Sequence, residues 1–167
     1  MPRQNRHALP YPALGRFAWL MGLYAENHER MERMFGLHRL VSGRWCSSVG
    51  DGLDLHVEVL ERHAHTLELR LSYALRDPIT GNPDPSAVLR AYLDSRQLEA
   101  HTCHVGRHWQ DVLGLHPAPQ VMLGHRLRMN SFLSKWLQYL EGQGHGAATL
   151  RRADADDIAH TVLVEGA

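Results

Sequence analysis

The sequence predicts an α+β fold in which two amphipathic helices cover one antiparallel sheet of five strands. Apolar residues recur every three or four positions over residues 14–35 and 123–142, which is the period of a helix buried on one side. Between these segments apolar and polar residues alternate, which is the period of a strand with one buried face. By analogy of topology, the same order of elements predicts a strongly bent, Sm-like small barrel as the finer form of the fold.

The first predicted helix occupies residues 14–35. Its apolar stripe is formed by Phe17, Leu20, Tyr24, Met31 and Phe35. Residues at these spacings lie on one side of a helix, and Gly36 follows as a predicted C-cap. Residues 1–12 are polar and contain prolines, so we expect an irregular arm there.

The first three predicted strands occupy residues 43–49, 53–60 and 66–75. Alternation in the second and third strands places one set of apolar residues on the core face: Leu53, Leu55, Val57, Val59, Leu67, Leu69, Leu71 and Tyr73. The short polar link at residues 61–65 predicts an antiparallel hairpin between these two strands.

A second predicted hairpin joins residues 88–94 to residues 98–105, after a proline-rich loop at residues 76–86. In the first arm, Leu89, Ala91 and Leu93 face the core, opposite Val88, Arg90, Tyr92 and Asp94. In the second arm, alternation places Glu99, His101 and Cys103 on one face, opposite Leu98, Ala100, Thr102 and His104.

The last predicted helix occupies residues 123–142 and ends at Gly142. A glycine-containing, acidic segment follows, so we expect residues 143–167 to form a flexible C-terminal tail. The sequence therefore predicts a single domain over residues 1–142.

Composition limits the function classes. The chain has 167 residues, no formal net charge and a pI of about 7.2, whereas a dedicated nucleic-acid binder is usually strongly basic. Its two cysteines do not make a disulfide framework, and no segment has the apolar length of a signal peptide or a membrane span. We therefore expect a reduced, cytoplasmic protein that does not bind membranes.

One stretch, EAHTCHVGRHW at residues 99–109, concentrates potential metal ligands. Strand alternation divides them, with His101 and Cys103 on one face and His104 on the other. Structural zinc sites use compact pairs such as CxxC, and the chain has none. A site could still form from His101 and Cys103 with His63 or His65 of the link at residues 61–65. The sequence nevertheless favours the absence of a metal site and of a cofactor.

Motifs of enzyme active sites are equally scarce. The sequence lacks GxSxG, GxxxxGK[ST] and GxGxxG, and it identifies no catalytic residue. The alternative is a small hydrolase or nucleotide-processing enzyme that uses Asp94, Glu99 and histidines as acids and bases.

Three segments, LYAENHERMERMF, LRAYLDSRQLEA and RLRMNSFLSKWLQYL, resemble the YqiB-like family of proteobacterial proteins, which contain a domain of unknown function. The matching positions are Asn27, Arg90, Tyr92, Asp94, Glu99, Arg126, Asn130, Phe132, Leu133, Trp136 and Leu137. The resemblance covers residues 14–142 and does not include His101, Cys103 and His104. It implies a shared fold and a cytoplasmic setting, and no activity.

The candidate ligand-binding residues are Arg90, Tyr92, Asp94, Glu99, Arg126 and Asn130. One interpretation is structural, with Arg90 paired to Asp94 or Glu99 across the hairpin. The other is a polar strand face that binds an anionic ligand, with Arg90 as the fork. The sequence favours a non-enzymatic binding or interaction module, with RNA, another protein or a second copy as the partner.

Overall fold

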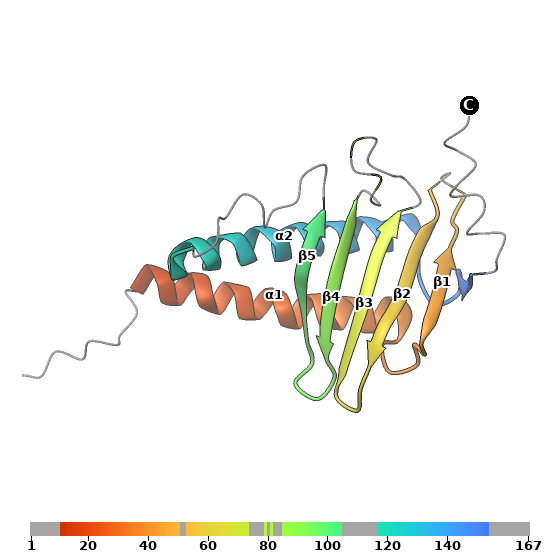
Figure 1. Ribbon diagram of the computed structural model, residues 1–167, viewed down its shortest axis with the longest axis horizontal. Helices are drawn as coiled ribbons and strands as arrows, with labels where there is room; N and C mark the ends of the chain where they lie inside the picture. Colours follow the sequence, from red (N-terminus) through yellow and green to blue (C-terminus); the bar gives the residue numbers. More distant parts are fainter. Residues whose placement is uncertain are drawn as a thin grey trace, which may run out of the picture.

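The computed structural model describes residues 11–50, 53–73, 79, 81, 85–104 and 117–153. Two helices pack against one six-stranded antiparallel sheet (Figure 1). The elements are α1 (Tyr11–Phe35), β1 (Gly43–Ser47), β2 (Leu55–Arg62), β3 (Thr66–Tyr73), β4 (Ser86–Tyr92), β5 (Gln97–His104), α2 (Pro119–Gln143) and β6 (Leu150–Arg152). The predicted α+β class is confirmed.

The sheet is open, with the order β5-β4-β3-β2-β1-β6. The predicted strongly bent, Sm-like form is therefore wrong, because β5 and β6 lie at opposite edges instead of closing on each other. The strands bury one face against the helices, so the fold protects its apolar surface without closing into a barrel.

The sixth strand was absent from the prediction of five. Leu150–Arg152 pairs antiparallel with β1, within the segment predicted as a tail. Hydrogen bonds hold the segment before β6 against β1. Ser47 Oγ on β1 lies 2.8 Å from His145 Nδ1 and 2.6 Å from Thr149 Oγ1. Residues 1–10 and 154–167, which include most of the predicted arm and tail, lie outside the described residues.

Both helices lie across the same face of the sheet, and their first turns extend past β5 (Figure 1). They run parallel to each other, as the contacts of Asn27 with Asn130 and of Arg33 with Glu141 show. The core between helices and sheet contains the predicted apolar faces of β2 and β3.

The helix ends differ from prediction. α2 begins at Pro119, since a proline is compatible with the first turn of a helix. It continues past the predicted end at Gly142 to a C-cap at Gly144, whose φ of 96° is left-handed and whose N–H bonds to the carbonyls of Leu140 and Glu141. Gly36, with a φ of 69°, caps α1 as predicted.

The predicted buried stripe of α1 holds except at Phe17, whose side chain is 48% exposed. The first turns of α1 extend past β5 (Figure 1), so the sheet does not cover the start of this stripe. Beyond the main core, a smaller cluster of Leu20, Leu23, Tyr24 and Leu127 holds the two helices together.

A β-bulge in β5 overturns the predicted alternation of that strand. Val88 pairs with Thr102, but its neighbour Leu89 pairs with Ala100, which leaves His101 as the extra residue. Cys103 consequently lies on the buried side with Ala100, and His101 is exposed. The His104 side chain lies outside the described part, so the prediction that it opposes His101 stays a prediction.

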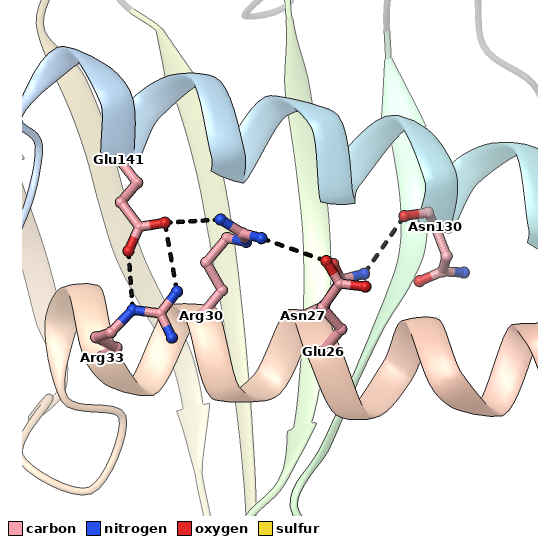
Figure 2. Close-up of polar contacts among 6 residues, drawn as sticks. All are labelled: Glu26, Asn27, Arg30, Arg33, Asn130 and Glu141. Atoms are coloured by element: carbon pink, nitrogen blue, oxygen red, sulfur yellow. Dashed lines mark hydrogen bonds and ion pairs between the residues drawn. The ribbon is translucent and has the colours of Figure 1, made fainter.

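Asn130 connects α1, α2 and β5. Its Oδ1 accepts a hydrogen bond of 2.8 Å from the backbone N–H of Ala100, and its Nδ2 donates to the carbonyl of Arg126 at 2.9 Å. Its own carbonyl accepts a bond of 3.3 Å from Asn27 Nδ2 (Figure 2). Both asparagines are fully buried. We call these two residues the asparagine joint.

We predict that Asn130→Ala lowers the free energy of unfolding by about 1–2 kcal/mol, because the N–H of Ala100 loses its partner in a buried place. Urea unfolding followed by circular dichroism measures the change. Ser131→Ala, at the adjacent and less buried position, is the control and should stay close to the wild type. Equal stability of Asn130→Ala and the wild type would contradict the structural role of the joint.

A second prediction concerns His28, which is buried and whose two ring nitrogens have no hydrogen-bond partner among the described residues. Burial lowers the pKa of His28, Glu32 opposes this shift, and Arg96 and His38 add to it. Below its ordinary pKa of 6.5, the unfolded chain therefore takes up a proton that the folded chain resists. Stability should fall as the pH decreases from 7 to 5.

His28→Leu should reduce this loss of stability, although His125 keeps a share of it because burial also lowers its pKa. Urea unfolding at pH 7 and pH 5 measures the difference. The control is His63→Gln, which changes an exposed histidine and should keep the wild-type dependence. An unchanged dependence in His28→Leu would show that this imidazole does not resist protonation.

Candidate ligand-binding site

Four of the six predicted site residues gather near β5. Arg90 and Tyr92 lie on β4, Glu99 lies on β5 and Arg126 lies on α2. The register of the second hairpin places Glu99 directly opposite Arg90. α2 crosses β5 (Figure 1), where the asparagine joint attaches it to the strand. We call Arg90, Tyr92, Glu99 and Arg126 the edge cluster.

Glu99 is at the centre of the edge cluster. The Tyr92 hydroxyl donates to Glu99 Oε1 at 2.9 Å, and Arg126 Nη1 lies 3.4 Å from Glu99 Oε2. The side chain of Glu99 is only 12% exposed, whereas that of Arg126 is 43% exposed. The carboxylate is therefore enclosed and held from two elements, while the guanidinium reaches solvent.

Arg90 has a different partner from those predicted. Its Nη2 donates to Glu68 Oε2 on β3 at 3.0 Å, instead of pairing with Asp94 or Glu99. Contacts with Glu68 and Tyr92 raise the pKa of Arg90, so this side chain stays charged. Its exposed fraction is 37%, against 26% for Glu68.

Two tyrosines reach the same carboxylate. Burial raises the pKa of Tyr92, the hydrogen bond to Glu99 raises it further, and Arg90 opposes the shift. Burial also raises the pKa of Tyr24 on α1, where Arg126 and Glu99 act in opposite directions. Tyr24 and the edge cluster together thus connect both helices to the sheet through phenol groups and charged pairs.

The remaining two predicted residues do not belong to this group. Asp94 is exposed in the β4–β5 turn, where its Oδ1 accepts the N–H of Ser95 at 2.8 Å. Asn130 is buried in the asparagine joint, and it holds the backbone of Arg126 in place. Its role is to position α2 rather than to contact a ligand.

Sequence reasoning missed Tyr24 and Glu68. Tyr24 was assigned to the apolar stripe of the first helix, and nothing in the period distinguishes a tyrosine whose hydroxyl reaches a polar partner. Glu68 has a visible signal, since it alternates with Leu67 and Leu69 and must face away from the core. Its pairing with Arg90 depends on the β3–β4 register, which the long loop between these strands leaves open.

The histidine and cysteine stretch does not form a reactive group in the described part. Burial raises the pKa of Cys103 to about 12, so the thiol stays protonated and is a poor nucleophile. Among the described residues, no group of three or more histidines, cysteines and carboxylates could hold a metal ion. His63, in the β2–β3 link, has Glu61 as its partner at 3.3 Å.

A second ionic group lies between the helices (Figure 2). Glu141 Oε2 accepts from Arg30 at 2.6 Å, and Glu141 Oε1 accepts from Arg33 at 2.9 Å. Hydrogen bonds and charge from Arg33, and then from Arg30, lower the pKa of Glu141. This group pairs helix with helix near the asparagine joint, and we assign it a structural role.

Comparison with protein families matches residues 30–146 to a family described as a protein of unknown function, DUF1249. The chain belongs to this family. The match includes the whole edge cluster and Asn130, and it begins after Asn27. The resemblance to a domain of unknown function is thus confirmed, while the narrower YqiB-like grouping stays a prediction.

Other comparisons add no named relative. No curated protein and no solved structure matches this chain. Within the described segments, neither helix combines the length and apolar character needed to cross a bilayer.

We predict that Glu99→Gln lowers the pKa of Tyr92, because the neighbouring negative charge that disfavours the phenolate is removed. Burial still raises the pKa of Tyr92 in this variant, and Arg90 still lowers it. An NMR titration of the tyrosine ring signals measures it. Glu58→Gln, on the same sheet face beside Arg44 and Arg70, is the control, and an unchanged Tyr92 pKa in Glu99→Gln would contradict the described geometry.

Proposed function

We propose that the protein is a cytoplasmic, non-enzymatic binding module whose edge cluster receives an anionic group of a partner protein. One observation carries the proposal. Arg90 and Arg126, whose side chains are each about two-fifths exposed, meet at one hydrogen-bonded pair of less exposed residues, with Arg90 in contact with Tyr92 and Arg126 in contact with Glu99.

Such an arrangement prepares arginine for binding. A guanidinium has five N–H donors, and the ion pairs with Glu68 and Glu99 involve one nitrogen of each arginine. Because both arginine side chains are already oriented, they lose less conformational freedom when a ligand carboxylate or phosphate binds. Tyr92 contacts Arg90 and donates a hydrogen bond to Glu99, the carboxylate that Arg126 also approaches.

The geometry supports binding better than hydrolysis. The two carboxylates of the hydrolase alternative have separate roles, since Asp94 caps a turn and Glu99 is held by Tyr92 and Arg126. A general acid–base pair needs carboxyl groups that face one reacting bond. RNA was suggested by the barrel analogy, which the open sheet does not support, so an acidic protein segment is the favoured ligand.

We predict that a fluorescein-labelled, glutamate-rich peptide binds the protein, and that Arg90→Gln combined with Arg126→Gln reduces the affinity at least about tenfold. Fluorescence anisotropy at low and at physiological salt measures the binding. The matched control is Arg44→Gln combined with Arg70→Gln, which removes two paired arginines from the same sheet face. This control should bind like the wild type.

Equal losses in both double variants would mean that the peptide senses only general charge, and the assigned site would be wrong. A mixed-sequence RNA oligonucleotide serves as a second probe. If the RNA binds with a steep salt dependence and the peptide does not, the partner class is nucleic acid and the proposal fails. Absence of binding to both probes would also overturn it.

A further inference from the structure

His28 on α1 is a buried histidine that neither the edge cluster nor the asparagine joint uses. The residue is 1% exposed, and both ring nitrogens lack a hydrogen-bond partner among the described residues. Buried polar groups are normally hydrogen-bonded, because they have lost their contacts with water. The imidazole can stay in this place only while it is neutral, since burying an unpaired charge costs far more than burying a neutral ring.

Charged groups from three segments act on His28. Glu32 lies one turn later on α1, His38 lies in the link between α1 and β1, and Arg96 lies in the β4–β5 turn at residues 93–96. The carboxylate of Glu32 is already engaged, since its Oε2 lies 3.1 Å from His38 Nδ1. Glu32 therefore has two histidines and one arginine near it.

The elements packed against α1 do not offer His28 a free carboxylate. These elements are β5 and α2. The carboxylate of β5, Glu99, is bonded to Tyr92 and Arg126, and Glu141 of α2 is bonded to arginines of α1. A positive charge on His28 would have to share Glu32 with groups that are already there.

The charge balance around His28 depends on pH. At neutral pH the negative charge of Glu32 offsets the positive charge of Arg96. Histidine side chains take up a proton between about pH 7 and about pH 5, so in acid three positive groups face one carboxylate. Repulsion between His28 and Arg96 then remains uncompensated.

Helix α1 is fixed on both sides of His28. The neighbouring residue Asn27 donates to the carbonyl of Asn130, and Arg30 bonds to Glu141 at 2.6 Å (Figure 2). Both contacts attach α1 to α2. A repulsive force between His28 and the β4–β5 turn therefore acts mainly on the turn.

The β4–β5 turn has one firmly attached end and one strained end. At the first end, the N–H of Leu93 donates to the carbonyl of His65 at 2.8 Å, and the side chain of Leu93 packs against the core. At the other end, Arg96 is exposed and has a φ of 56°. This left-handed conformation is unfavourable for a residue with a side chain, so the Arg96 end is the part that gives way.

We propose that His28 is a pH-sensitive contact between α1 and the β4–β5 turn. At neutral pH the uncharged ring stays buried and the turn keeps its place beside α1. When the ring gains a proton, repulsion from Arg96 displaces that end of the turn and water reaches the imidazolium. Tyr92 and Glu99 lie on the two strands that the turn joins, so the movement extends to the edge cluster. The inference concerns the structure of the chain and does not depend on the proposed function.

An NMR titration of the full chain from about pH 7.5 to about pH 5 tests the proposal. The imidazole signals of His28 and the amide signals of Ser95 and Arg96 should change with one common midpoint, below the ordinary histidine pKa of 6.5. The amide signal of Leu133, in the buried centre of α2, should stay unchanged, because only the turn is released.

Two variants separate the two sides of the contact. His28→Leu keeps an apolar side chain in the buried place and should abolish the transition of the turn. Arg96→Asn removes the repelling charge, and asparagine tolerates the left-handed backbone. In Arg96→Asn the midpoint of His28 should move to higher pH. Because Arg96 is exposed, this second variant keeps the test valid if the leucine variant does not fold.

The matched control is His65→Gln. It removes an exposed histidine ring beside the turn and keeps the backbone carbonyl that holds Leu93. This control should show the wild-type transition. Loss of the transition in His65→Gln would assign the pH response to that histidine and overturn the proposal.

Four further results would contradict the pH-sensitive contact. The turn signals stay constant over the whole pH range, or they change in His28→Leu as they do in the wild type. The midpoint of His28 is the same in Arg96→Asn and in the wild type. Finally, the signal of Leu133 disappears together with the turn signals, which would mean that acid unfolds the whole domain and releases no local contact.

Discussion

The asparagine joint is the contact on which the arrangement of helices and sheet depends. Asn130 is hydrogen-bonded at the same time to the backbone N–H of Ala100 on β5, to the carbonyl of Arg126 on α2 and to the side chain of Asn27 on α1. Because β5 is an edge strand, the N–H of Ala100 would otherwise face a place without a strand partner. One amide side chain therefore covers part of the sheet edge and sets the position of both helices against it.

The candidate site follows from this placement. Once Asn130 holds α2 beside β5, Arg126, one turn earlier, comes within reach of Glu99. The same placement leaves the first turns of both helices beyond the sheet (Figure 1). Phe17 and Trp19, near the start of α1, are exposed. The edge cluster and the exposed start of α1 are thus two consequences of helices that extend past β5.

The candidate site shows which side-chain positions can be predicted from the period of the sequence and which cannot. Alternation correctly placed Arg90 and Tyr92 on the solvent face of their strand, and the resemblance to a family pointed to Glu99 and Arg126. Alternation did not predict that Arg90 pairs with Glu68, because that contact depends on the register of two strands joined by a long loop. Alternation also placed Cys103 on the same strand face as His101, because a β-bulge cannot be recognised from an alternating pattern.

By itself, the sequence determined the α+β class, the helices and the buried faces of the central strands, because each of these depends on the local period of apolar residues. Only the tertiary structure decided the rest: the open sheet, the sixth strand, the bulge, and the partners of Asn130 and Arg90. These features join residues far apart in the chain, as with Ala100 and Asn130 or Glu68 and Arg90. Their energies depend on distance and burial, which exist only after the chain has folded.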